Sequence, residues 1–325
     1  MTVSPDEPGA ASAPAVRNDV LRDHSALPPT EQRNPRTMAI DVLPTRDVLG
    51  LLNAEDAIVP GAVRAVIGAL ADVVDTAADR VRRGGRVHYY GAGSSGRIAV
   101  LDATELAPTF GLAPGVVIPH LAGGDAAMTR AVEGAEDDEA RGGAEARAEV
   151  GDRDVVIGLS ASGRTPYVAG ALAAASRCGA YTVVITSDPG SRLLPLAAVG
   201  LVAETGPEAI AGSTRMKATT AMKLILNSFS TALMIRLGKT YSNLMVGVSA
   251  SNTKLRDRKV RILAEASGEP RPACEAALGE ADGDLRLAMV MVLGRVGVAD
   301  ARSALAAVSQ DREGGSVRSA LARLP

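Results

Sequence analysis

Apolar residues follow two alternating periods along the middle of the chain, and this alternation predicts the fold class. After Pro60 they recur every three or four residues, which predicts a helix that ends near Gly84-Gly85. Short apolar runs follow, and each predicts a strand, at 86–90, 115–120, 154–159, 181–186 and 201–204. Helical stretches separate most of these runs, and such alternation is typical of a parallel, doubly wound sheet flanked by helices.

Changes in composition predict three segments. Residues 1–35 are rich in Pro, Ala, Ser and charged side chains without an apolar period, so we expect a mostly disordered tail. Residues 36–250 carry the strand and helix pattern of one α/β domain, in which 126–150 predicts a charged helix broken at Gly142-Gly143. Residues 251–325 contain short amphipathic stretches and predict a small all-helical C-terminal domain.

A glycine-rich loop, Gly91-Ala92-Gly93-Ser94-Ser95-Gly96, follows the first predicted strand and leads into a helix. Free backbone N–H groups at a helix N-terminus bind anions. A dinucleotide site would also need an acidic residue at the end of the second strand, and that strand runs into residues 119–124 with no acid before Asp125. The sequence therefore favours a terminal phosphate bound by Gly93, Ser94 and Ser95.

A second loop rich in hydroxyl groups, Ser160-Ala161-Ser162-Gly163-Arg164-Thr165, follows the third predicted strand. Pro166 then takes the first helical position. Two such loops at the carboxyl ends of neighbouring strands can converge on one phosphate, so Ser160, Ser162 and Thr165 are candidate ligands. The alternative is an ordinary strand-to-helix connection in which Thr165 caps the helix.

These two loops resemble those of the sugar isomerase (SIS) family of phosphosugar-binding domains, whose second loop reads Ser-x-Ser-Gly-x-Thr. Five strings in order narrow the resemblance to the N-acetylmuramic acid 6-phosphate etherase family. They span roughly residues 30 to 310 and are Tyr90-Gly-Ala-Gly-Ser-Ser-Gly-Arg97, Leu101-Asp-Ala-Thr-Glu-Leu-Ala-Pro-Thr-Phe110, Ala131-Val-Glu-Gly-Ala-Glu-Asp137, Ala211-Gly-Ser-Thr-Arg-Met-Lys217 and Asn243-Leu-Met-Val246.

The resemblance implies a SIS-type domain and a carbon–oxygen lyase. It would cleave the D-lactyl ether of N-acetylmuramic acid 6-phosphate to N-acetylglucosamine 6-phosphate and D-lactate, by elimination and then hydration, in cell-wall amino sugar recycling. The resemblance makes Glu105 the proton donor to the lactyl oxygen and Glu136 the base at C2, with Glu133 as the rival of Glu136. Taken without the resemblance, residues 133–139 would be a solvated helix face and Glu105 a surface residue.

The substrate would carry a phosphate and a carboxylate, so basic side chains near the motifs are candidate contacts. Arg215 and Lys217 open the long apolar stretch and are the preferred candidates, while Arg97 and Arg164 are weaker ones. Glu208 lies just upstream and could reach the site. Asp102 is expected to organise its helix rather than to react.

Charge and cysteine content restrict the other partners. A net charge of −2 argues against nucleic acid as a main partner, since phosphate backbones demand a basic excess. Cys178 and Cys274 lie far apart in no metal-binding spacing, and the three histidines, His24, His88 and His120, are scattered, so we expect neither metal nor cofactor.

No apolar run reaches the roughly 20 residues that cross a bilayer, and no signal pattern opens the chain, so we expect a cytoplasmic protein without a membrane partner. Residues 213–237 predict one helix that is apolar nearly all round and must be buried against the sheet or a partner subunit. Such domains usually form homodimers, and we expect one here.

Two other functions on the same fold stay open. An aldose–ketose isomerase would also begin by removing the C2 proton but would release no lactate. A non-catalytic sugar-phosphate regulator would keep the phosphate loops but would need no paired carboxylates. The presence of both Glu105 and Glu136 favours the lyase.

Overall fold

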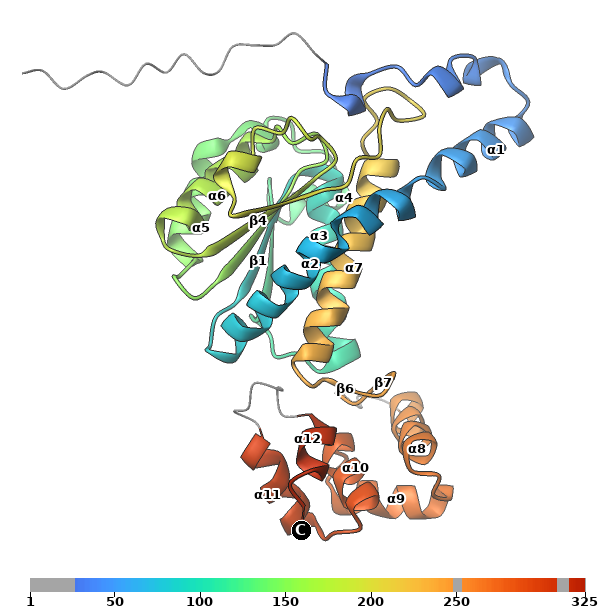
Figure 1. Ribbon diagram of the computed structural model, residues 1–325, viewed down its shortest axis with the longest axis vertical. Coiled ribbons are helices and arrows are strands. Elements are labelled where there is room, and N and C mark those ends of the chain that lie inside the picture. The colour runs from blue at the N-terminus through green and yellow to red at the C-terminus, as the bar shows by residue number, and fades with distance from the viewer. Residues whose placement is uncertain (1–26, 248–252, 309–315, 325) are drawn as a thin grey trace, which may run out of the picture.

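A five-stranded parallel sheet forms the centre of the larger domain (Figure 1). The computed structural model describes residues 27–247, 253–308 and 316–324. The strand order is β2-β1-β3-β4-β5, with bounds β1 Val87–Gly91, β2 Val117–Leu121, β3 Val155–Leu159, β4 Tyr181–Thr186 and β5 Val199–Val202. Helices cover both faces of the sheet, so the predicted doubly wound α/β fold is confirmed.

One face of the sheet packs against three helices, α2 (Val59–Arg82), α3 (Gly93–Phe110) and α7 (Lys217–Arg236). Aromatic side chains are few, so alanine and aliphatic residues fill most of this core, with Tyr89 meeting Phe229 edge to face at 6.3 Å between ring centroids. The carboxylate of Asp102 on α3 accepts hydrogen bonds from Tyr89 Oη at 3.0 Å and Ser230 Oγ at 2.9 Å. Asp102 therefore joins α3, β1 and α7, as expected of a residue that organises its helix.

Burial explains the apolar character of α7, which starts four residues later than the sequence predicts.

The stretch Thr45–Arg82, which comprises α1 (Thr45–Asp56) and α2, is long and apolar enough to cross a membrane by length and composition alone. Within this stretch, α2 buries one side, which includes Val73 and Ala77, against α7 and the sheet, and 33% of the most apolar window is buried.

The other face of the sheet packs against α5 (Glu139–Glu149) and α6 (Pro166–Arg177). The predicted single helix over 126–150 is wrong, because the chain forms α4 (Ala126–Thr129), the 3₁₀ turn η4 (Ala135–Asp137) and then α5. Gly142 and Gly143 lie inside α5 and do not break it.

Close contact between α5 and α6 is the reason for these glycines. A Cβ atom at Gly142 would lie 1.9 Å from the carbonyl oxygen of Tyr167, and one at Gly170 would lie 2.0 Å from that of Glu139. The absence of side chains thus lets the two backbones touch, and this benefit outweighs the low helix propensity of glycine.

The 3₁₀ turns η1 (Pro29–Glu31), η2 (Pro35–Thr37) and η3 (Ile40–Val42) precede α1, and the segment that holds η1 and η2 packs onto the sheet domain. The expected tail was to reach residue 35, but Thr30 and Asn34 are buried, and Asn34 Nδ2 donates to the carbonyl oxygen of Pro207 at 3.2 Å. The rest of the expected tail, residues 1–26, lies outside the described residues.

A second unit of short helices follows the sheet domain, as the sequence predicts (Figure 1). The antiparallel pair β6 (Thr240–Tyr241) and β7 (Leu244–Met245) leads into it. Its own apolar core includes Leu263, Ala288 and Met289. The expected domain boundary at residue 250 lies outside the described residues, and the helices are α8 Thr253–Ser267, α9 Arg271–Glu280, α10 Leu285–Gly294, α11 Val298–Val308 and α12 Val317–Leu321.

Gly170→Ala is expected to lower the free energy of unfolding by about 3 kcal/mol, because the new methyl group would overlap the Glu139 carbonyl and push α5 from α6. The matched control is Gly68→Ala on α2, where an added Cβ meets no described atom within 4 Å. The control should gain about 0.5–1 kcal/mol. Urea unfolding followed by circular dichroism measures both, and equal effects would contradict the close contact.

Candidate active site

The two predicted phosphate loops begin side by side at one edge of the sheet. In the parallel pair of β1 and β3, Gly91 is the partner of Leu159, so the loops that follow start about 4.8 Å apart. The first loop leads to α3 on one face of the sheet and the second leads to α6 on the other. Diverging connections of this kind form the crevice in which α/β domains bind ligands.

The first loop is built by close backbone contact. Gly93 begins α3 with a positive φ of 54°, and Ser95 is buried beneath the helix N-terminus. A Cβ atom at Gly96 would lie 2.6 Å from the carbonyl oxygen of Gly91, so only glycine lets the helix start this near to the strand. The arrangement leaves the half-buried Ser94 and the first N–H groups of α3 at the edge of the crevice.

The second loop is held from inside by its own hydroxyl groups. Ser160 Oγ is buried and lies 2.8 Å from Thr165 Oγ1. Gly163 adopts a positive φ of 68°, and its carbonyl oxygen accepts from Ser191 Oγ at 2.9 Å. Ser162 is half-buried on this braced loop.

A pocket of about 330 Å³ opens between the first loop and the segment that joins α4 to η4. Glu136 lies on η4, and Glu133 lies in the turn before it. Both glutamates line the pocket, opposite Gly93 and Ser94 of the first loop. The structure therefore brings the first predicted phosphate loop and two carboxylates together, whereas the residues that line this pocket include none of the second loop. Both Glu133 and Glu136 stay candidates for the base.

Arg97 also lines this pocket and holds its wall in place. Its Nε donates to the carbonyl oxygen of Ala127 at 2.9 Å, and its second guanidinium nitrogen donates to that of Arg130 at 3.2 Å. These bonds fix α4 against α3, so Arg97 positions the segment that carries the glutamates.

Glu105 lies far from this pocket in the same chain. It follows Gly93 by 12 residues on α3, which corresponds to about 18 Å along a helix axis. Its side chain is exposed, on the same side of α3 as Leu101, which is itself 49% exposed. One chain alone therefore does not bring Glu105 to Glu136.

Lys217, a predicted substrate contact, lies instead in a buried ion pair. Its Nζ is 2.6 Å from Glu55 Oε2, and the lysine is 1% exposed. Glu55 also accepts from Arg36 at 2.9 Å and from Asn34 at 2.7 Å. The hydrogen bond from Arg36, followed by those from Lys217 and Asn34, lowers the pKa of Glu55 to about 2, although burial opposes this.

Glu208 is fully buried and caps the start of α7. Its carboxylate accepts hydrogen bonds from the backbone N–H groups of Lys217 and Ala218, both at 3.0 Å, and burial raises its pKa. Arg215 and Arg164 are exposed, Arg215 in the turn before α7 and Arg164 on the second loop. Glu55 is not predictable from the sequence, because its partner Lys217 lies 162 positions away and no local pattern links the two residues.

This chain is similar to a family of SIS domains and to etherases. A family model described as the glucokinase regulatory protein N-terminal SIS domain matches residues 69–176. An N-acetylmuramic acid 6-phosphate etherase of Thermobifida fusca (strain YX) is 58% identical over 265 residues, covering 82% of this chain and 87% of that protein. A protein of the same name from Pectobacterium atrosepticum is 48% identical over 277 residues, covering 85% and 91%.

A solved phosphoheptose isomerase from Francisella tularensis covers 59% of this chain and 98% of its own, with 18% identity and a TM-score of 0.47.

Glu55→Gln is expected to lower the free energy of unfolding at pH 7 by about 3 kcal/mol, because it leaves Lys217 buried without a countercharge. The folded-state pKa of Glu55 lies below the ordinary value, so its stabilisation is present above about pH 4.5 and is lost as pH falls towards 2. Urea unfolding between pH 7 and pH 2 should show a shallower decline for the variant than for the wild type.

A second variant separates the ion pair from a general packing defect. Adding Lys217→Met to Glu55→Gln removes the stranded charge, so the double variant should be more stable than Glu55→Gln alone. If the double variant is no more stable than Glu55→Gln alone, Lys217 and Glu55 are not energetically coupled, and the buried ion pair does not explain the loss of stability.

Proposed function

Because the chain belongs to the N-acetylmuramic acid 6-phosphate etherase family, we propose that its pocket holds the sugar phosphate beside paired carboxylates. The protein is an etherase, a carbon–oxygen lyase that acts on N-acetylmuramic acid 6-phosphate in cell-wall amino sugar recycling. The single observation that carries the site is the pocket that joins the first phosphate loop to Glu133 and Glu136.

The chemistry explains why carboxylates are needed. The lactyl oxygen of the ether is a poor leaving group. The open-chain sugar, however, carries an aldehyde that makes its C2 proton more acidic. A base removes this proton, the resulting enolate expels the lactyl oxygen from C3, and water then adds at C3. One group must take the C2 proton and another must protonate the leaving oxygen, and two carboxyl groups in different environments can do both.

We assign the phosphate to the crevice between the two loops. Gly93, Ser94 and Ser95 offer the N-terminus of α3, and Ser162 offers a hydroxyl group from the neighbouring strand end. Ser160 and Thr165 stay proposed phosphate ligands, although their hydroxyl groups bond each other in this structure. Arg215 is exposed before α7 and is proposed to face an anionic group of the substrate. Lys217 was a candidate substrate contact, but its side chain pairs with Glu55, so we propose that it acts on the site indirectly, by fixing the start of α7.

Glu136 is the proposed base at C2, and Glu105 the proposed acid for the lactyl oxygen. Glu105 lies about two helical turns beyond the last pocket residue of α3, so the Glu105 of the same chain does not reach the pocket. We propose a homodimer in which Glu105 of the partner subunit completes the site.

Exposed apolar side chains on the surface support the proposed homodimer. An apolar groove of about 400 Å³ runs between α2 and α7, with Ile67 and Ile235 on its walls, 55% and 53% exposed. Leu101 adds a further exposed apolar side chain on the face of α3 that carries Glu105. Exposed apolar surfaces of this kind mark association sites.

We further propose that the homodimer works in the cytoplasm. Among the described residues, both cysteines, Cys178 and Cys274, are free thiols, which fits a reducing compartment.

Incubation with N-acetylmuramic acid 6-phosphate and an assay for released D-lactate test the assigned residues. Glu105→Gln and Glu136→Gln should each lower kcat at least about 100-fold, since each removes one proton transfer. Glu133→Gln tests the rival base, and Glu139→Gln on the exposed start of α5 is the control. Wild-type turnover in both Glu105→Gln and Glu136→Gln would overturn the assignments. Turnover without lactate would indicate an isomerase, and binding without turnover a regulator.

Mixed dimers test where Glu105 acts. A dimer of one Glu105→Gln chain and one Glu136→Gln chain has one intact site only if each site takes Glu136 from one chain and Glu105 from the other. Random mixing of the two inactive variants should then restore about one quarter of wild-type activity. No recovery, with dimer exchange confirmed by native mass spectrometry, would place both glutamates in one chain or remove Glu105 from the reaction.

A further inference from the structure

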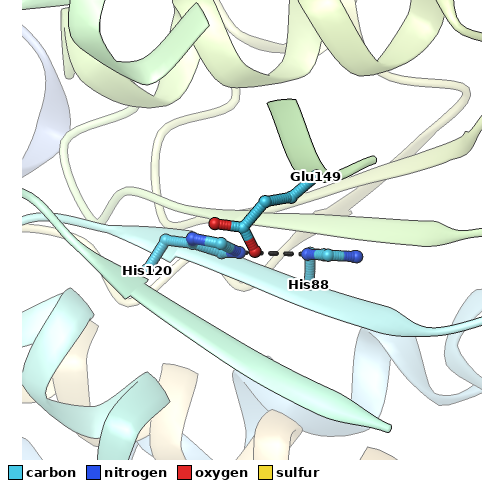
Figure 2. A group of neighbouring side chains, drawn as sticks. All are labelled: His88, His120 and Glu149. Carbon is cyan, nitrogen blue, oxygen red and sulfur yellow. Dashed lines mark hydrogen bonds between the residues drawn. The ribbon is translucent and has the colours of Figure 1, made fainter. Parts of the chain in front are cut away.

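Two histidines that are scattered in the sequence lie together on the sheet face beneath α5 (Figure 2). His88 stands on β1 and His120 on β2, and the parallel register pairs His120 with Tyr90, two residues beyond His88. His88 Nδ1 lies 3.0 Å from His120 Nε2, and both residues are buried. The sequence predicted no metal cluster, because neighbouring strands, and not sequence spacing, bring these side chains together.

Glu149 at the end of α5 completes a group of three potential ligands. Its carboxylate reaches over the two imidazole rings (Figure 2), and one ligand atom from each of the three residues lies within 4.8 Å of the others. We propose that His88, His120 and Glu149 bind one divalent transition-metal ion, with Zn²⁺ as the ion that best suits two imidazoles and one carboxylate.

The separation of the nitrogens fits this ion. Zinc binds imidazole nitrogen at about 2.0–2.1 Å, so two nitrogens on one tetrahedral zinc lie about 3.3 Å apart. The observed 3.0 Å between His88 Nδ1 and His120 Nε2 requires only a small opening. Glu149 is exposed, so an ion can enter from solvent and keep a water molecule as its fourth ligand.

A carboxylate behind His88 favours the required orientation of its ring. His88 Nε2 lies 3.4 Å from Asp154 Oδ2, and Asp154 is fixed by the N–H groups of Arg86 at 2.7 Å and Gly151 at 2.9 Å. A proton on Nε2 facing this carboxylate leaves the Nδ1 lone pair directed at His120. Metal-binding histidines characteristically carry a carboxylate on the second nitrogen.

Charge and packing around the three ligands agree with a bound dication. Glu145 adds a second carboxylate near His120, while the positive Arg86 is paired with Asp154. Tyr90 stacks on His120 at 4.1 Å between ring centroids and holds that ring in place.

The ion would have a structural role. His120 precedes the pocket residue Ala122 by two positions, and Tyr90 precedes the first phosphate loop. A metal joining β1, β2 and the end of α5 would brace the strand ends from which the pocket wall starts. Without an ion, the same histidines form only a hydrogen-bonded pair, and the experiment distinguishes the two cases.

The test uses the full chain, stripped of metal by a chelator and titrated with Zn²⁺ in a calorimeter. We expect one equivalent per chain and a rise in Tm of about 5 °C at a hundredfold excess over Kd. Glu149→Gln should weaken zinc binding at least about 10-fold with its fold intact, because Glu149 is exposed. His120→Asn should do the same, while Glu139→Gln on the same helix is the control and should bind as the wild type does.

The visible absorption of bound Co²⁺ is a second measurement of metal binding, and it does not depend on the stability of the protein. Co²⁺ bound to two imidazoles and a carboxylate gives a visible d–d absorption band, which should appear with the wild type and Glu139→Gln and be lost with Glu149→Gln. Zinc binding that is equal in all four proteins, or absent from the wild type, would overturn the proposal.

Discussion

Strand β1, through its backbone hydrogen bonds to β2 on one side and to β3 on the other, positions the two predicted phosphate loops and the pair of histidines. Its C-terminal end sets the first phosphate loop beside the second, because Gly91 is the partner of Leu159. Its middle sets His88 beside His120 on the face covered by α5. A one-residue slip of β1 would turn these side chains to the opposite face of the sheet, so one hydrogen-bond register fixes both.

The loops and helices around this strand depend on contacts that tolerate little change. Glycines at the start of α3 and between α5 and α6 let backbones touch where any side chain would overlap a carbonyl oxygen. At the start of α7, the buried ion pair of Lys217 and Glu55 joins the N-terminal segment to the helix that follows Arg215. A buried charge is tolerated only when it is paired, and Glu55 meets this condition with three donors, from Lys217, Arg36 and Asn34.

The distribution of the carboxylates is the reason for proposing a homodimer. Glu133 and Glu136 border the pocket, whereas Glu105 lies on an exposed helix side next to Leu101. An acid on an open surface cannot exclude water or hold a substrate by itself. In the proposed homodimer, a second copy covers the apolar groove between α2 and α7, where Ile67 and Ile235 are exposed.

The sequence by itself determined the features that depend on local pattern. Apolar periods gave the strands, the long buried helix and the helical C-terminal unit, and the five motif strings identified the family, because these signals lie within a few residues of each other. Tertiary structure alone decided the partner of Lys217, the continuity of α5 through Gly142, the proximity of His88 to His120 and the separation of Glu105 from Glu136. Each of these depends on residues far apart in the chain, whose distance is set by strand register and helix packing rather than by sequence spacing.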